Sequence, residues 1–331
     1  MFKRIHFATI LILITMTCAL ASLFEFRNKV LESKLPLVAI ASYGPHSSLD
    51  AAIRGTKDEL RDLGFIEGQN IRYEISNASF DPALIPQVIT TLKSHHPKVM
   101  VILNTPVAQF AKTAVHDIPI VCSVITDPVE AGLLKTSNQP EGNITVSSDR
   151  QDLTILLQFA KKLIPQAKRV GLLYATAESN DLALVKMMQA AAAKLHMEVI
   201  AIPVDQARDV HIRMQEFKGK ADFIYVGSSG PIQPTLPTIA AEAKKMGIPV
   251  FNLNQEAVKE GIALASFGVD YDMVGRNAGK LAARLLNGED IRKLTPLYPT
   301  QAEHHGFINK HVAEEFSINI PEGLKNVEIV N

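Results

Sequence analysis

Short apolar runs alternate with stretches of helical periodicity along most of the chain. The run at 37–42 (LVAIAS) has no alternation of apolar and polar residues, which is typical of a strand covered on both faces. Apolar residues at helical spacing then predict a helix over 48–63, which Gly64 ends as a left-handed cap. The same order predicts further strands at 71–75, 99–103 and 118–124, and helices at 82–94 and 107–116.

The alternation of apolar runs and helical stretches starts again at residue 169 and predicts a second series of strands and helices. Two such series predict an α/β protein made of two doubly wound parallel-sheet lobes. A stretch that contains Pro and Gly, 136–143, is expected to cross between the lobes. The strands predicted in the second series are 169–174, 198–203, 223–226, 249–252 and 264–269, and the helices are 180–195, 210–217, 233–246 and 273–286.

The first residues of the chain have the composition of an export signal. Two positive residues precede an apolar run, and a small-x-small pattern ends at Ala21. We therefore expect a signal peptide over 1–21, cleaved after Ala21, and a spacer over 22–34. A retained membrane anchor is the alternative, because the run approaches the ~20 residues that span a bilayer. Lipidation at Cys18 is a further alternative, although the residues before it lack the usual pattern.

Composition and charge narrow the range of partners. The chain has 331 residues, enough for two lobes, and Lys plus Arg equals Asp plus Glu at 34 each. This balance gives no reason to expect nucleic acid or an anionic membrane surface as a partner. No Trp is present, which argues against a platform that stacks on sugars. Cys122 lies in an apolar run, so we expect a buried small side chain rather than a nucleophile.

Polar residues follow the predicted strands, where parallel sheets usually bind their ligands. Several stand directly before a helix, whose free N–H groups can hold a carboxylate. Each also has a simpler interpretation, since a Ser, Thr, Asn or Asp there is usually an N-cap worth ~1 kcal/mol. The candidate ligand-binding residues are Tyr43, His46, Asn104, Thr105, Asp127, Asn180, Ser228, Asn252 and Asp270.

Three candidates carry specific alternatives. Asp127 is followed by Pro128 and could cap a helix or pair with a ligand ammonium group, and Asp270 faces the same choice. His46 could contact a ligand or be an exposed loop residue without a role.

Catalytic and cofactor motifs are missing from the sequence. No GxGxxG follows the first strand, no P-loop is present, and 227–230 (GSSG) does not match a nucleophile elbow. The pairs His95-His96 and His304-His305 lack the spacing of metal ligands. We therefore expect a binding protein without cofactor or metal rather than an enzyme. An α/β enzyme acting on a small substrate and a membrane-anchored ligand sensor are the alternatives.

Blocks along the chain resemble the ABC-transporter substrate-binding family that includes tryptophan- and aromatic-amino-acid-binding members. The resemblance covers about 35–320. The matching blocks are 48–70, 104–109, 118–134 (IPIVCSVITDPVEAGLL), 165–174 (PQAKRVGLLY), 178 with 180, 248–251 and 268–276. The chain departs from the pattern at 228–230 (SSG) and 175–176 (AT), where related chains tend to carry Asp-Asn and Asn-Pro. Both departures remove polar groups from the cleft edge of the second lobe.

The resemblance implies a type I periplasmic-binding-protein fold that crosses three times between its lobes. One lobe is expected from 35–147 plus 255–290, and the other from 148–254 plus 291–331. Such proteins bind a ligand in the cleft and signal to an ABC permease by hinge closure. We expect an exported, monomeric binder of a small polar ligand, an amino acid, with an aromatic one as the narrower version.

The resemblance also implies roles for individual residues. Asn180 or Thr105 would lie near a ligand carboxylate. Asp127 or Asp270 would lie near an amine. Tyr43 would lie on a loop of the cleft.

Overall fold

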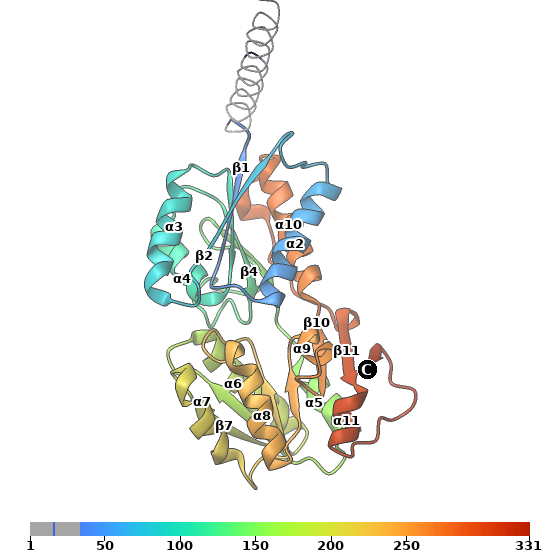
Figure 1. The fold of residues 1–331 in the computed structure, drawn as a ribbon. Coiled ribbons are helices and arrows are strands. Elements are labelled where there is room, and N and C mark those ends of the chain that lie inside the picture. The colour runs from blue at the N-terminus through green and yellow to red at the C-terminus, as the bar shows by residue number, and fades with distance from the viewer. Residues whose placement is uncertain (1–15, 17–33) are drawn as a thin grey trace, which may run out of the picture.

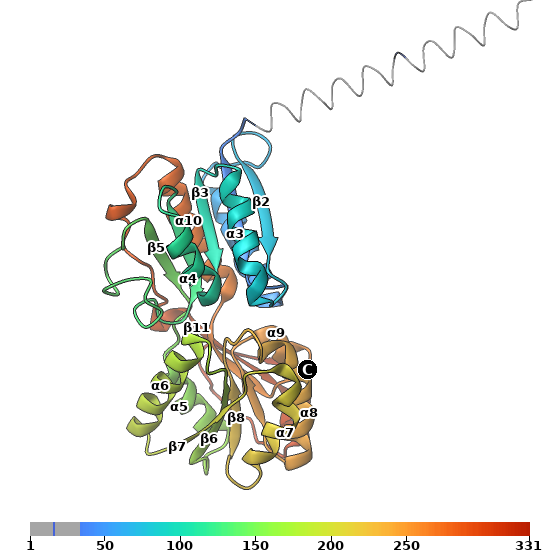
Figure 2. The ribbon, with the colours of Figure 1, turned by 90° about the vertical axis from the view of Figure 1, so that its left-hand side faces the viewer.

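The computed structural model describes residue 16 and residues 34–331. The expected signal peptide at 1–21 and spacer at 22–34 therefore lie almost wholly outside the described residues. Figures 1 and 2 show two lobes, one above the other, joined by connecting segments of the chain at a narrow waist. Within the described residues, no helix is long and apolar enough to cross a membrane.

The first lobe is a five-stranded parallel sheet covered by helices on both faces. Alternate residues of its first strand point to opposite faces. Val38 and Ile40 join the core under α2 and α10, while Ala39 and Ala41 join the core under α3 and α4. In sheet order the strands are β2 (Arg72–Asn77), β1 (Leu37–Ser42), β3 (Val99–Leu103), β4 (Ile120–Ile125) and β5 (Ile144–Ser148), and the helices are α2 (Ser47–Asp62), α3 (Ile85–Ser94), α4 (Thr105–Ala114) and α10 (Tyr271–Leu286).

The second lobe is a seven-stranded sheet with one antiparallel pair, β10 with β11. Helices α5 and α6 pack together on one face, and α7 and α8 pack together on the other. In sheet order the strands are β12 (Val327–Val330), β11 (His304–Asn309), β10 (Ala265–Val269), β9 (Val250–Asn252), β8 (Phe223–Val226), β6 (Arg169–Tyr174) and β7 (Glu198–Pro203), and the helices are α5 (Leu153–Leu163), α6 (Ser179–Lys194), α7 (Val210–Met214), α8 (Leu236–Met246), α9 (Gln255–Lys259) and α11 (Lys310–Glu315).

The chain crosses between the lobes three times, after β5, after β10 and before β11. The second crossing lies at Asp270, so the expected boundary at 255 is wrong: β10 pairs with β9 and β11 in the second sheet. The third follows Leu297, whose backbone bonds to Val146 and Ser148 of the first lobe. The expected start of the last segment at 291 is therefore also wrong.

The stretch 136–143 does not cross between the lobes. It is a loop of the first lobe, and Asn143 holds its end by donating from Nδ2 to the carbonyls of Val115 and Ile118. The chain then forms β5, an edge strand that the apolar pattern did not predict, and crosses only after it. Cys122 is fully buried in β4 as expected, and burial raises the pKa of its thiol to about 12.

Helix α10 returns to the first lobe and packs backbone to backbone against α2. A Cβ on Gly275 would overlap the carbonyl group of Ala52, and one on Gly55 would overlap the carbonyl oxygen of Asp272. The Oγ1 of Thr56, fully buried, donates to the carbonyl oxygen of Gly275 at 3.0 Å. Glycine is required at these contacts because no side chain fits between the helices.

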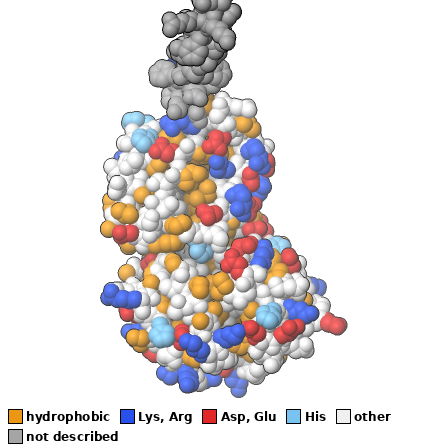
Figure 3. Space-filling model, viewed as in Figure 1, with side chains coloured by type: hydrophobic (Ala, Val, Ile, Leu, Met, Phe, Trp, Pro, Cys, Tyr) orange, Lys and Arg blue, Asp and Glu red, His pale blue; other side chains and the backbone are white. Residues whose placement is uncertain are grey.

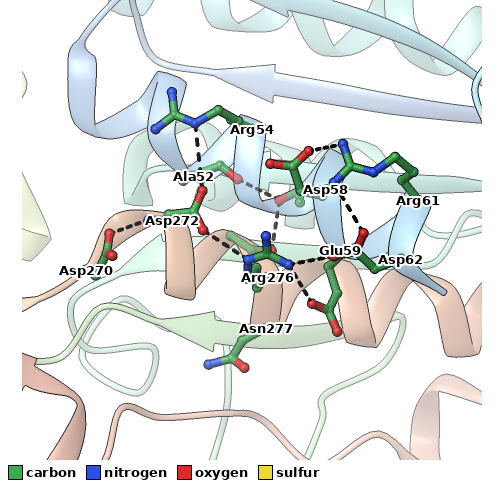
Figure 4. Close-up of polar contacts among 12 residues, drawn as sticks. Ala52, Arg54, Asp58, Glu59, Arg61, Asp62, Asp270, Asp272, Arg276 and Asn277 are labelled. Carbon is green, nitrogen blue, oxygen red and sulfur yellow. Dashed lines mark hydrogen bonds and ion pairs between the residues drawn. The ribbon is translucent and has the colours of Figure 1, made fainter.

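A guanidinium group bridges the same two helices at their exposed edge. Arg276 of α10 donates to Asp62 (3.0 Å) and Glu59 (3.3 Å) of α2 and to Asp272 of its own helix (3.1 Å) (Figure 4). Hydrogen bonding to Arg276 and Arg61 lowers the pKa of Asp62. Exposed pairs of this kind stabilise little on their own. The glycine contact beneath them therefore decides how closely α2 and α10 approach.

Gly275→Ala is expected to destabilise the protein by about 2–4 kcal/mol, because the helices must separate to admit a methyl group. In an exposed helix the same change stabilises by about 1 kcal/mol, so the sign is diagnostic. Urea unfolding measures the effect, with Lys280→Ala on the exposed face of α10 as the control. A Gly275→Ala protein as stable as the wild type would contradict this account of the packing.

Candidate ligand-binding site between the lobes

A cavity lies between the lobes at the carboxyl ends of the central strands of both sheets. About 500 Å³ of space between protein atoms lies there, in part open to solvent, and the constriction between the lobes is visible on the surface (Figure 3). The lining residues are Tyr43, His46, Ser48, Leu49, Phe80, Asn104, Thr105, Pro106, Val124, Glu178, Asn180, Ser228, Ser229, Gly230, Gln233, Leu253 and Tyr271.

The wall from the first lobe presents hydrogen-bond donors. The N-termini of α2 and α4 reach the cavity, and the first N–H groups of a helix have no partner within it. Burial lowers the pKa of His46, and its Nδ1 accepts from the Ser48 N–H, so the neutral ring carries its proton on Nε2. The Ser48 hydroxyl is buried and has no partner among the described residues.

Two strained residues shape the same wall. Asn104 has a φ of 75°, and its Oδ1 accepts from the Tyr43 N–H at 3.3 Å. Val124 has a φ of 56°, which is unfavourable for a β-branched residue, at a bulge in β4 between Ser123 and Ile125. The bulge places Val124 in the cavity lining. Strain of this kind is characteristic of functional sites.

The wall from the second lobe presents hydrogen-bond acceptors. Glu178, only 8% exposed, precedes α6 and accepts from the Gly230 N–H through Oε2. The Asn180 amide donates to Asp181 (3.0 Å) and to the Ser228 carbonyl (2.6 Å), which leaves its Oδ1 without a partner. Gln233 likewise donates to the Gly227 carbonyl and has an unpartnered Oε1. Acceptors of this kind suit a cationic donor.

Glu178 and the neighbouring Asp181 are buried carboxyl groups that make no salt bridge within the described part of the chain. Burial raises the pKa of Glu178. Burial, and then the nearby Glu178 charge, raise the pKa of Asp181 well above its usual value. The second-lobe wall therefore holds a buried carboxyl group, Glu178, without a cationic partner among the described residues.

The lobes touch each other around the cavity. Gly230 of the second lobe lies so close to Tyr43 of the first that a Cβ there would overlap the tyrosine ring. Asn254 donates to the Ser47 hydroxyl at 2.8 Å, and Gln109 donates to the Ser179 hydroxyl at 3.0 Å, both from one lobe to the other. These contacts define a closed arrangement.

Six of the nine candidate residues from the sequence line the cavity. They are Tyr43, His46, Asn104, Thr105, Asn180 and Ser228. Three do not line it. Asp127 accepts from the N–H groups of Val129 and Glu130 and pairs with Arg150, and Asp270 caps α10. Asn252 is fully buried and bonds to Val226 and Asn254.

The sequence interpretation missed several lining residues. Glu178 was noticed only as part of a family block, although a carboxylate directly before a helix was a usable signal. Phe80, Gln233, Leu253 and Tyr271 also line the cavity and were not among the candidates. Gly230 fills the place of an expected polar group and allows the lobes to approach.

Comparison with known proteins identifies the family to which the chain belongs. Residues 37–328 match the family of ABC transporter substrate binding proteins. The chain belongs to this family. It is a substrate-binding protein rather than an enzyme, and it serves an ABC transporter on the outer side of the cytoplasmic membrane. The two-lobed parallel-sheet fold expected from the sequence is confirmed.

Two relatives of this substrate-binding protein have names that state a ligand. A tyrosine-binding protein of Clostridioides difficile is 33% identical over 265 residues, which are 80% of this chain and 76% of the relative. A Streptococcus pneumonia domain in complex with L-Trp matches with a TM-score of 0.84 and 26% identity, over 90% of this chain and all of that one.

The comparisons also bear on the closed arrangement. The ligand-free, open structure of a substrate-binding protein with adhesive properties from Clostridium difficile has a TM-score of 0.70, at 27% identity and over 89% of this chain and 99% of that one. At nearly equal identity, the protein superimposes better on the L-Trp complex than on this open form. This agrees with the contacts between its lobes.

Glu178→Gln is expected to raise the melting temperature of the ligand-free protein at about pH 8. A carboxyl group whose pKa is raised on folding contributes stability below its unfolded pKa, and this is lost as the pH rises through the folded pKa. The advantage of the variant should therefore shrink as the pH falls to about 5. Asp127→Asn is the control and should lose about 1 kcal/mol, because it weakens the hydrogen bonds that Asp127 accepts from the turn after it. A lower melting temperature for Glu178→Gln at the higher pH would refute the electrostatic argument.

Gly230→Ala is expected to hold the lobes apart, because the added methyl group overlaps Tyr43 and comes within 2.6 Å of Glu178 Oε1. Small-angle X-ray scattering in the presence of ligand should then report a larger radius of gyration than for the wild type. Binding should weaken by about tenfold or more, while the ligand-free melting temperature stays near that of the wild type. A variant that closes fully on its ligand would show that this contact does not limit closure.

Proposed function

We propose that this substrate-binding protein captures an aromatic L-amino acid in the cavity between its lobes and delivers it to an ABC importer. The observation that carries the proposal is the division of the cavity into a wall of donors and a wall of acceptors, with apolar and aromatic side chains between them. A zwitterionic amino acid matches this division, because its carboxylate accepts hydrogen bonds and its ammonium group donates them. The names of two relatives, a tyrosine-binding protein and an L-Trp complex, support the aromatic class.

The ammonium group is assigned to the second lobe. Glu178 supplies the charge, and the free oxygens of Asn180 and Gln233 supply two further acceptors for its three N–H groups. This replaces the earlier hypothesis that Asp127 or Asp270 pairs with the amine. Asn180 also changes role, because its unpartnered atom is an acceptor and its amide hydrogens are already used.

The carboxylate group is assigned to the first lobe. Its partners would be the Ser48 hydroxyl, the His46 Nε2–H, the Thr105 hydroxyl and those N–H groups at the starts of α2 and α4 that have no partner among the described residues. The ligand would then bridge the lobes with its two charged groups, which are both bonded to its α-carbon. Ligand capture and closure of the lobes become one event.

An apolar part of the cavity remains for the side chain of the ligand. Tyr43 and Phe80 pack edge to face with ring centroids 5.7 Å apart, and Leu49, Val124 and Leu253 lie near them in the lining. Aromatic rings gain most from such an enclosure, because they bury the largest apolar surface.

The N-terminal segment supports export, with Lys3 and Arg4 before an apolar run and a cleavage pattern ending at Ala21. We infer a monomer that docks on the permease through its two lobes. Cleavage is distinguished from a retained anchor by the mass of the protein recovered from the extracytoplasmic fraction.

Aromatic amino acids are expected to raise the melting temperature of the protein in proportion to RT ln(1 + [L]/Kd), without turnover. A thermal-shift screen over the twenty amino acids, followed by isothermal titration calorimetry, tests this. Glu178→Gln should weaken binding by about 30-fold or more, since a buried charge pair loses one partner. Asp127→Asn, a carboxylate outside the cavity, should bind as the wild type does.

Two results would contradict the proposal. Flat melting across the amino acid panel would exclude the amino acid class. Equal loss of affinity in Glu178→Gln and Asp127→Asn would remove Glu178 from its assigned role.

A further inference from the structure

A second, smaller compartment adjoins the ligand cavity on the side of the hinge. It shares Ser228, Leu253 and Tyr271 with the cavity already described. Its remaining lining comes from the first lobe, the first crossing and the second lobe. These residues are Thr126, Asp149, Gln151, Leu153, Leu184, Met187 and Tyr225.

Asp149 closes this compartment at the first crossing. It is 4% exposed, and its Oδ2 accepts a hydrogen bond from the Tyr271 hydroxyl at 3.1 Å. Its Oδ1 is buried without a partner among the described residues. No lysine, arginine or histidine lines the compartment to neutralise it, and burial raises the pKa of Asp149 to about 6. An unmet acceptor with this burial is costly, so a donor from elsewhere would stabilise it.

The Tyr225 hydroxyl, which lines the same compartment, donates to Gln151 Oε1 at 2.9 Å. Among the side-chain atoms of this lining, Asp149 Oδ1 is the one that is buried without a partner. Apolar side chains of Leu153, Leu184, Met187 and Leu253 complete the lining.

The two compartments lie in sequence along the cleft. Glu178 lines the first and is absent from the second, whereas Asp149 lines the second and is absent from the first. A ligand held by its ammonium group at Glu178 can extend its side chain past Ser228, Leu253 and Tyr271, which line both. The end of the side chain then approaches Asp149.

We propose that Asp149 is a specificity-determining residue that selects aromatic amino acids with a hydrogen-bond donor at the far end of the ring, tyrosine above phenylalanine. This rests on the proposed function. The donor, a phenol O–H or an indole N–H, bonds to Asp149 Oδ1. Phenylalanine would bury the same oxygen and leave it unsatisfied, and sites of this kind reject such analogues strongly.

The test measures affinities of L-Tyr, L-Phe and the methyl ether of L-Tyr by calorimetry. The ether keeps the oxygen and removes the donor. The wild type should bind L-Tyr about 30-fold or more tightly than either analogue. Asp149→Asn presents an amide that can keep the bond to Tyr271, and should lower the preference by weakening L-Tyr binding while L-Phe binding stays equal or improves. Asp127→Asn should keep the wild-type preference.

The outcomes separate this inference from the proposed function. Binding of L-Tyr, L-Phe and the ether with equal affinity by the wild type would overturn the role of Asp149 and leave an aromatic amino acid binder. If Asp149→Asn kept the full wild-type preference for L-Tyr over L-Phe, the role of Asp149 would likewise be overturned. If no aromatic amino acid binds, the proposed function fails and the inference fails with it. The wild-type comparison of L-Tyr with its ether decides the matter even where the variant does not fold.

Discussion

The contact between α2 and α10 determines where the binding site is built. Gly55 and Gly275 let the two helix backbones meet, so α10 is fixed against the first lobe although it follows a strand of the second. The start of α10 is thereby fixed as well, and with it Tyr271, which lines both compartments of the cleft and donates to Asp149. A packing requirement between two helices thus positions the hinge. Any loosening of the helices would be transmitted to the lining of the cavity.

The site is built at a cost to the stability of the ligand-free protein. Glu178, Asp181 and Asp149 are buried carboxyl groups without a cationic partner among the described residues, and burial raises the pKa of each. A hydrophobic or amide side chain would be cheaper at these positions. The arrangement makes physical sense when a cation and a hydrogen-bond donor arrive together with the ligand. The protein is then stabilised by the ligand at the same places where it is unstable without it.

The sequence was sufficient for the fold class and for much of the first-lobe wall. Buried strands such as 99–103 appear as unbroken apolar runs, and the residues that follow them, including Asn104 and Thr105, must lie at the carboxyl edge of the sheet. The crossings could not be predicted in this way. The apolar run of β10 indicates a strand but does not say which sheet it joins, and that is decided by pairing with β9 and β11. Asp127 and Asp270 are not in the lining for a related reason. Asp127 accepts from the backbone of the turn that follows it, and Asp270 accepts from the start of α10, so neither side chain points into the cavity.

Closure and recognition use the same atoms, which explains how binding can be communicated to a transporter. Glu178 accepts from the Gly230 backbone, and Gly230 in turn lies against Tyr43 of the other lobe. A cation at Glu178 therefore strengthens a wall that is also part of the contact between the lobes. A ligand shifts an equilibrium only by its difference in affinity for the two states. In the proposed mode of binding, the two charged groups of the ligand can bond to both walls at once only when the lobes are closed, so the closed form would be the one that the loaded protein presents.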